Sequence, residues 1–361
     1  MRKDRVSVAM VGAGRVAQHY RKMLDLPGVS GWRMAGVCDL RSDRADPLAR
    51  HFGCPSFGDY AAMLDQCRPD LALVLTPSGL HDAHARAALD RGVHVLVEKP
   101  IAMLASQARA LASLARDRRL MYGVVFQNRL NPAILCLREA LRGGRFGRIV
   151  TATVRLRWCR YQDYYDDGWH GTWANDGGVI NQQAIHHVDA LNWLVGPIEA
   201  VNATAANRVN HLEAEDTMVA TVRLPGGALG TIEATTAARP DDFEASLSVV
   251  GEKGLAVVGG IALNRVQTWR FVEPLAGDED APERWSREVP SGYGLSHGPL
   301  LQQVIDALRD GRTDPPVAAD EGIATTALVH ALYRSDELQS WVALADEPVS
   351  ERLGRIPAAV R

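Results

Sequence analysis

The stretch VAMVGAGRVAQHY, residues 8–20, decides the fold of the first third of this chain. An apolar run gives way to Gly12-Ala13-Gly14 and then to a helical pattern, which indicates a strand, a tight turn and a helix. Gly12 permits the sharp turn, Gly14 lets the backbone approach a pyrophosphate, and Ala17 lets the helix pack near the strand. N–H groups at the helix N-terminus favour phosphate. We therefore predict a dinucleotide-binding βαβ unit; the alternative is a structural unit whose glycines serve only the turn.

An acidic residue follows the second predicted strand, the apolar residues 34–38. Asp39 lies roughly 25 residues after Gly14, near the spacing of the acid that binds the adenosine ribose in such units. A carboxylate there accepts hydrogen bonds from both ribose hydroxyls and repels a 2′-phosphate. The sequence therefore predicts NAD as the cofactor, in preference to NADP.

The chain has 361 residues, of which 47% are hydrophobic and 23% are charged, and its formal net charge is −3. The length predicts two domains, and the charge gives no footprint for nucleic acid or an acidic membrane surface. We find no membrane-spanning apolar stretch and no cleavable leader, so we expect a cytoplasmic protein. The spacing of the cysteines predicts reduced thiols and no disulfide framework, and the spacing of the cysteines and histidines predicts no metal site. The cysteines are Cys38, Cys54, Cys67, Cys136 and Cys159.

The fold class predicted from the pattern is α/β, with two domains. Residues 1–126 alternate near-continuous apolar strands with helices, as in a doubly wound parallel sheet of the Rossmann type. The further strands predicted there are 71–76, 93–98 and 120–125, and the helices are 42–51, 59–66, 79–91 and 106–117.

Residues 127–361 have a different pattern, in which strands of alternating polarity dominate. We predict an α+β domain with an open, mostly antiparallel sheet backed by helices. Residues 273–292 are acidic and predict a surface loop. The predicted strands are 148–158, 199–209, 216–224, 228–238, 245–252 and 254–259, and the predicted helices are 132–142, 183–195, 298–310 and 320–338.

A lysine ends one of the predicted parallel strands, in the sequence Glu98-Lys99-Pro100. Ligands of open α/β sheets bind beyond the carboxyl ends of the strands, so Lys99 is expected in the same crevice as the glycine turn. Its amine can donate to a substrate hydroxyl, and a cationic nicotinamide ring nearby would lower its pKa toward neutrality. Pro100 restricts Lys99 to extended geometry and permits a cis peptide. The alternative is a surface lysine at a strand end.

A second cluster of polar residues lies on the helix predicted at 183–195. Gln182 and His186 are four residues apart, which places them on one helical face, and Asp189 could hold an imidazole nitrogen. A neutral imidazole suits a general base that takes a proton from a secondary alcohol, so His186 is the candidate. We expect His187 to be structural.

Between these clusters lies RWCRYQDYYDDGWHGTWANDGG, residues 157–178, which is dense in aromatic side chains. Aromatic rings stack on sugars or uracil, and guanidinium groups bind carboxylate or phosphate. The stretch therefore predicts a carbohydrate or nucleotide pocket, and the alternative is a loop folded over its own small core.

The motifs GAGRVA (12–17), TPSGLH (76–81), EKP (98–100) and the Gly-Gly, His and Asp of the second cluster together resemble the Gfo/Idh/MocA oxidoreductases. The resemblance implies Lys99 and His186 as the catalytic pair, and a C-terminal sheet that makes dimer or tetramer contacts. It implies that the following residues bind the nicotinamide dinucleotide: Gly12, Gly14, Arg15, Val16, Asp39, Thr76, Pro77, His81, Glu98, Lys99 and Gln127.

Longer stretches, including QNRLNP (127–132) and RYQDYYDDGWHGTW (160–173), look like the WlbA-type UDP-N-acetyl-2-amino-2-deoxyglucuronate (UDP-GlcNAcA) dehydrogenases of this family. That branch oxidises the 3′-hydroxyl of its sugar with NAD⁺, for surface polysaccharides. Gln182 departs from the Asp or Asn usual there, and an amide cannot take a proton. Alternatives are another nucleotide sugar, a free sugar or polyol, or a non-catalytic dinucleotide sensor. The implied substrate-binding residues are Lys99, Arg160, Tyr164, Tyr165, Trp173, Gln182, Gln183 and His186.

Overall fold

The computed structural model describes residues 4–355, which divide into two compact units. The first holds the described residues up to Phe126 together with Leu295–Thr326, and the second holds Gln127–Gly294 and the described residues from Ala327 onward. We predicted one change of domain after residue 126, with all later residues in the second domain. The return of Leu295–Thr326 to the first unit was not predicted, because an amphipathic helix pattern does not specify which sheet the helix covers.

The first unit contains a six-stranded parallel sheet with the order β3-β2-β1-β4-β5-β6, so the predicted Rossmann sheet is confirmed. The strand order reverses between β1 and β4, and ligands of such sheets bind at the carboxyl ends of the strands at this switch point. The strands are β1 (Val6–Val11), β2 (Trp32–Cys38), β3 (Ser56–Phe57), β4 (Leu71–Val74), β5 (His94–Val97) and β6 (Tyr122–Val124).

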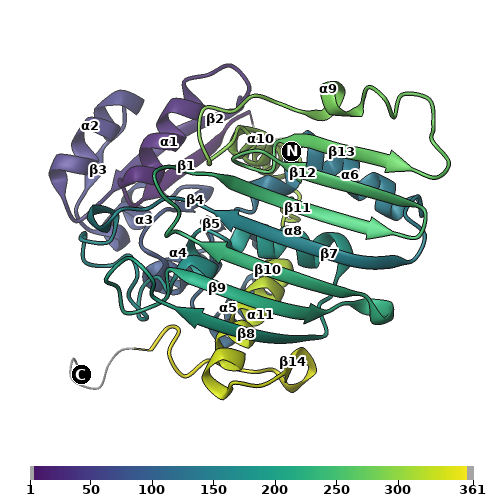
Figure 1. The fold of residues 1–361 in the computed structure, drawn as a ribbon. Helices are drawn as coiled ribbons and strands as arrows, with labels where there is room; N and C mark the ends of the chain where they lie inside the picture. Colours follow the sequence, from purple (N-terminus) through teal and green to yellow (C-terminus); the bar gives the residue numbers. More distant parts are fainter. Residues whose placement is uncertain (1–3, 356–361) are drawn as a thin grey trace. The chain divides into compact units, whose positions relative to one another are not determined.

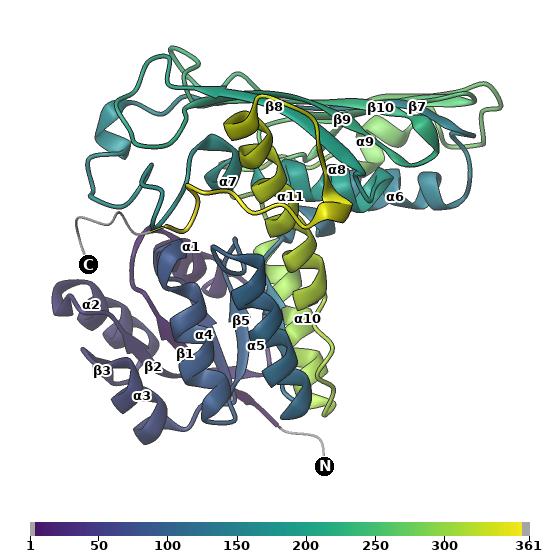
Figure 2. The ribbon, with the colours of Figure 1, turned by 90° about the horizontal axis from the view of Figure 1, so that it is seen from below.

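Helices flank this parallel sheet (Figure 2). Right-handed crossovers place the helices after β1 and β2 on one face and those after β3, β4 and β5 on the other. A helix from late in the chain, α10, packs against α1 and β1. The helices are α1 (Arg15–Leu24), α2 (Ser42–Phe52), α3 (Tyr60–Cys67), α4 (His81–Asp90), α5 (Ala105–Asp117) and α10 (His297–Arg309).

The second unit contains an eight-stranded sheet with the order β13-β12-β11-β7-β10-β9-β8-β14, seen face-on in Figure 1. Its strand pairs are antiparallel except β10 with β7, which run parallel, so the predicted mostly antiparallel sheet is also confirmed. The strands are β7 (Ile149–Arg157), β8 (Ala200–Ala206), β9 (Thr217–Arg223), β10 (Leu229–Thr235), β11 (Glu244–Gly251), β12 (Gly254–Gly259), β13 (Arg265–Phe271) and β14 (Val342–Ala343).

The helices of the second unit cover one face of this sheet, and in Figure 2 α6 and α8 lie on the same side of it. Along β9, Met218, Ala220 and Val222 are buried, whereas Val219 and Thr221 between them are exposed. The residues that the structure describes therefore leave this second face of the sheet uncovered at β9. The helices are α6 (Pro132–Arg142), α7 (Val179–Gln182), α8 (Ile185–Val195), α9 (Ala281–Trp285) and α11 (Ala319–Leu338), the last of which begins in the first unit.

The helix predicted at 183–195 is confirmed as α8, and the short α7, which was not predicted, precedes it and is separated from it by residues 183–184. Two other local features differ from the expectation. The loop predicted at 273–292 contains α9, whose first turn holds a proline that fits a helix start. The strand β13 was not predicted, because Arg265, Gln267 and Arg270 leave it with a weak apolar pattern.

Candidate functional site

The glycine turn joins β1 to α1 and lies beside the end of β4. Gly12 has φ +92°, and a Cβ on it would lie 2.6 Å from the carbonyl oxygen of Leu75, so only glycine fits. A Cβ on Gly14 would meet no atom within 4 Å, so the backbone there can be approached closely. Gly14 has no side chain that could cap α1. In the first turn of α1, Arg15 is exposed and Val16 is half-buried. The turn therefore has the form that a pyrophosphate requires.

The carboxylate of Asp39 is held against this turn. Its Oδ2 accepts the N–H of Ala13 over 2.7 Å, and its Oδ1 accepts the N–H of Arg41 over 2.9 Å. Each oxygen keeps a second lone pair, with which it can accept from a ribose hydroxyl. The guanidinium of Arg41 is bound to Asp43, with 2.6 Å between Nη2 and Oδ2. The residues present therefore fit the adenosine end of NAD.

His81 connects the loop after β4 to the loop after β5. Its Nδ1 lies 2.7 Å from the carbonyl oxygen of Pro100, and its Nε2 lies 2.8 Å from that of Thr76. Burial lowers the pKa of His81, although both carbonyl contacts act in the opposite direction. Pro77 begins the turn that leads into α4, and the Lys99-Pro100 peptide is cis. His81 thus ties the turn after Lys99 to the end of β4.

Glu98 and Lys99 follow β5 directly. Glu98 is buried, and its carboxylate accepts the hydroxyl proton of Tyr20 over 3.1 Å and the N–H of Lys99 over 3.2 Å. Lys99 itself is half-buried. The carboxylate of Glu98 therefore holds the main chain of Lys99, a supporting role that the sequence did not suggest.

The Gly177-Gly178 pair before α7 is set by a buried glutamate. Glu215 Oε1 accepts the N–H of Ile180 over 3.1 Å and the hydroxyl proton of Tyr333 over 3.0 Å. A Cβ on Gly178 would lie 2.2 Å from Glu215, so a larger residue cannot stand there. Burial raises the pKa of Glu215 to about 7. Glu215 and Tyr333 were not predicted, because neither lies near these glycines in the sequence.

In the second polar cluster, the relative placement of Gln182 and His186 differs from the prediction. Gln182 ends α7 and His186 lies in the first turn of α8, so the four-residue spacing does not place them on one face of a continuous helix. His186 is half-buried. The carboxylate of Asp189, which we expected to hold an imidazole, is bound bidentately by Arg129 over 2.8 and 2.7 Å. His187 is buried, which lowers its pKa to about 4 and agrees with a structural role.

The aromatic loop brings only some of its predicted residues together. Tyr164 accepts a hydrogen bond from Gln183 Nε2 over 3.4 Å, and the guanidinium of Arg160 lies 5.6 Å from the Tyr164 ring. Arg160 also donates to Asp242 over 2.9 Å. Tyr164, Gln183 and Arg160 therefore form one group.

Tyr165 and Trp173 are packed within the second unit. Tyr165 is buried, shares a 2.7 Å hydrogen bond with Thr236, and has its pKa raised to about 12 by burial. This burial argues against the predicted substrate contact of Tyr165. The ring of Trp173 meets that of Tyr333 edge-on at 5.1 Å, and Arg352 lies 4.8 Å from it. Tyr165 and Trp173 thus pack against residues outside the stretch 157–178.

Two predicted site residues have a buried side-chain amide oxygen that could accept a hydrogen bond from a ligand. Gln127 Oε1 and Gln183 Oε1 accept no hydrogen bond from the described residues, 4–355. Such groups are costly unless a partner binds them. They therefore fit the polar ligands that we predicted for both residues.

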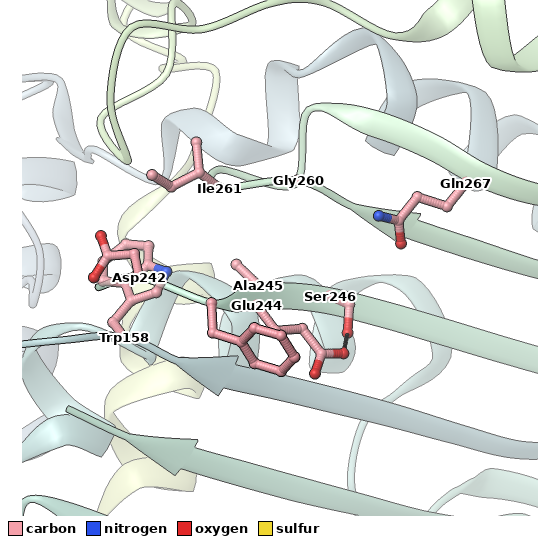
Figure 3. A pocket seen from close by; sticks show the side chains of 9 residues that line it. Trp158, Asp242, Glu244, Ala245, Ser246, Gly260, Ile261 and Gln267 are labelled. Atoms are coloured by element: carbon pink, nitrogen blue, oxygen red, sulfur yellow. Dashed lines mark hydrogen bonds between the residues drawn. The ribbon is translucent and has the colours of Figure 1, made fainter. Parts of the chain in front are cut away.

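A separate cavity of about 200 Å³ lies beside the ends of β7, β11 and β12 (Figure 3). Within it, Glu244 accepts a hydrogen bond from Ser246 over 2.7 Å and from Arg157 over 3.0 Å. It contains none of the predicted site residues. Its lining residues are Trp158, Asp242, Phe243, Glu244, Ala245, Ser246, Gly260, Ile261 and Gln267.

The two units correspond to two known domain families. Residues 6–126 match the family described as "Oxidoreductase family, NAD-binding Rossmann fold", and residues 134–257 match the "GFO/IDH/MocA C-terminal domain". The chain belongs to the Gfo/Idh/MocA oxidoreductases. This member of the family is an NAD-dependent oxidoreductase, as its glycine turn and Asp39 predicted. Within residues 4–355, no helix is long and apolar enough to cross a membrane, and no group of three or more His, Cys, Asp or Glu could hold a metal.

Solved structures resemble this Gfo/Idh/MocA member over most of its length. The WlbA dehydrogenase from Bordetella pertussis, in complex with NADH and UDP-GlcNAcA, is 34% identical over 95% of this chain and 99% of its own, with a TM-score of 0.89. The WlbA dehydrogenase from Chromobacterium violaceum, with the same two ligands, is 33% identical over 94% and 96%, with a TM-score of 0.87. The D-glucoside 3-dehydrogenase of Escherichia coli K12 is 32% identical, and the match spans 58% of this chain and 60% of that enzyme.

Proposed function

We propose that this NAD-dependent sugar dehydrogenase oxidises the 3′-hydroxyl of a UDP-linked, N-acetylated amino sugar uronate of the UDP-GlcNAcA type to the 3-keto sugar. The observation that carries the proposal is the likeness to the two WlbA dehydrogenases, which bind NADH and UDP-GlcNAcA and share about a third of their residues with this chain. The keto product is ready for transamination on the way to surface polysaccharide sugars.

Lys99 and His186 carry the proposed chemistry. When NAD⁺ is bound, it supplies the hydride acceptor. Lys99, held at the end of β5 by the bond between its N–H and Glu98, donates a hydrogen bond to the oxygen of the reacting hydroxyl. His186 takes the proton of that hydroxyl, a role that suits a neutral imidazole.

The amides beside His186 orient the sugar and do not react. Gln182 and Gln183 are buried, and an amide can donate to and accept from hydroxyls but cannot serve as a base. Gln183 also donates a hydrogen bond to the hydroxyl of Tyr164, so a ligand bound at Gln183 Oε1 would lie close to both side chains. This group, with Arg160, is our candidate for recognition of the uronate and its nucleotide.

Turnover assays test the substrate. The purified chain is supplied with NAD⁺ and UDP-GlcNAcA, and NADH absorbance is followed against parallel reactions with other UDP-sugars, free glucosides and inositol. The proposal requires the UDP-linked uronate to have the highest kcat/KM. A higher kcat/KM with a free glucoside would contradict the proposal and indicate a substrate like that of the Escherichia coli relative. Cofactor binding without reduction by any sugar would support a dinucleotide sensor.

A second proposal concerns the open face of the eight-stranded sheet. Val219 is 53% exposed and Leu229 is 61% exposed, and both point away from the helices. We infer that a second copy of the chain covers this face in a dimer or tetramer, because burying apolar strand positions is favourable and an uncovered face of this kind is an interaction surface.

A further inference from the structure

Glu98, whose bond holds the main chain of Lys99, belongs to a buried cluster of titratable side chains in the first unit. His297, the first residue of α10, is 2% exposed, and Glu98 is 6% exposed. His297 Nε2 lies 3.7 Å from Glu98 Oε1, an ion-pair distance. On the other side of the ring, His297 Nδ1 lies 3.3 Å from His19 Nε2 of α1. The cluster therefore runs from the end of β5 through α10 to α1.

The two neighbours of His297 place a hydrogen-bond acceptor beside each of its ring nitrogens. Burial first, and the charge of His297 second, lower the pKa of His19 to about 4, so His19 is neutral and can accept a proton from Nδ1. Burial alone would raise the pKa of Glu98, but its neighbours His297 and Lys99 outweigh that effect and lower it. An imidazolium can donate toward both the carboxylate and the neutral ring. The geometry is therefore that of a buried histidine–carboxylate pair whose second ring nitrogen faces His19.

Glu98 acts on Lys99 in two ways. Its Oε2 accepts the Lys99 N–H over 3.2 Å while Tyr20 donates to Oε1 over 3.1 Å, and together these bonds fix the main chain at Lys99. Its negative charge, buried beside Lys99, also favours the ammonium form of that side chain. A positive charge on His297 would offset this second effect and leave the first in place.

We propose that His297 is a positioning residue for Lys99, whose imidazolium balances the buried carboxylate of Glu98 so that Glu98 orients Lys99 without fixing it in the charged form. A neutral amine can accept as well as donate a proton at the reacting oxygen. The inference rests on the proposed role of Lys99. Other titratable or charged groups that face the cluster include Tyr20 and Lys22 on α1, and His81 at the start of α4.

The test measures how readily Lys99 reacts with an amine-acylating reagent as pH is varied. The full chain is labelled as purified, without sugar, and the Lys99 peptide is quantified by mass spectrometry. His297→Gln, which keeps an N–H donor and loses the charge, should move the labelling midpoint to higher pH, and Glu98→Gln should move it to lower pH. Each shift should be on the order of half a pH unit to one pH unit. The double variant should return close to the wild-type midpoint.

His51→Gln is the matched control, because it removes a histidine–carboxylate pair on the surface of the same unit, with 2.7 Å between His51 Nε2 and Asp25 Oδ1. Its midpoint should equal that of the wild type. A merely structural role of His297 would move both cluster variants in the same direction or neither, and either result overturns the proposal. If His297→Gln does not fold, His297→Asn takes its place, and an unchanged or lowered midpoint in that variant overturns the proposal.

The labelling result does not depend on which sugar the enzyme oxidises. Opposite shifts with no turnover of UDP-GlcNAcA would support the role of His297 and reject the proposed substrate. Turnover of UDP-GlcNAcA with unshifted labelling midpoints would support the proposed substrate and reject the role of His297. In an active enzyme, the limb of the kcat/KM pH profile that moves in His297→Gln should move by the same amount as the labelling midpoint.

Discussion

Tyr333 donates its hydroxyl proton to Glu215 over 3.0 Å and accepts the N–H of Gly178 over 2.9 Å. Two residues far from the predicted site in sequence thus hold the turn that leads to the helices carrying Gln182 and His186. Glu215 is buried in this network, and burial raises its pKa from an ordinary 4.5 to about 7.

The raised pKa of Glu215 predicts a pH-dependent stability. The folded chain holds this proton more tightly than the unfolded chain, so the contribution is fully present below about pH 4.5 and is lost as pH rises to about 7. Glu215→Gln should therefore lessen the fall in the free energy of unfolding across this range by about 2–3 kcal/mol. Urea unfolding at several pH values measures this change in the free energy of unfolding. The substitution Glu213→Gln, at an exposed residue, is the control. An equal slope in Glu215→Gln and the wild type would contradict the assignment.

Lys99→Ala and His186→Ala should each lower kcat by about 10²-fold or more, with smaller changes in KM. Both groups are proposed to act on the reacting hydroxyl in the transition state, and truncation removes that action while the rest of the site still binds. Steady-state kinetics with the best substrate measure the effect. His51→Ala, on the surface of the first unit, serves as the control. Turnover near the wild-type value in either variant would remove that residue from the mechanism.

Asp39→Ala should raise KM for NAD⁺ by about tenfold and narrow the preference for NAD⁺ over NADP⁺. The variant loses the acceptors proposed for the ribose and the charge that repels a 2′-phosphate. Kinetics with both cofactors give the ratio. Asp65→Ala, which removes a surface carboxylate paired with Arg91, should leave the ratio unchanged. An unaltered ratio in Asp39→Ala would refute the ribose assignment.

Val219→Glu should shift the protein to a smaller species in solution. The substitution places a charge on the open face of the sheet, where a second copy is proposed to bury apolar side chains. Light scattering coupled to gel filtration gives the mass. Val209→Glu is a matched control, since Val209 is 51% exposed, close to the 53% of Val219, but lies outside the strands. A monomeric wild type, or equal masses for both variants, would rule out this interface.

The site could be predicted where its signal was local. Gly12, Gly14 and Asp39 were found because turn geometry and strand ends are encoded within a few residues, and the structure holds Asp39 against the turn. The bidentate bond of Arg129 to Asp189 was not predicted, because the two residues lie 60 positions apart in the chain.

Alternating strands and helices, the glycine turn and the position of Lys99 after a strand were therefore determined by the sequence alone, since periodicity and short-range sterics set them. Only the tertiary structure decided that Glu215 underlies the Gly177-Gly178 turn, that the helix before His186 is interrupted, and that His297 reaches Glu98. These contacts join residues distant in the chain, and no local pattern records which buried charge will meet which partner once the core has closed.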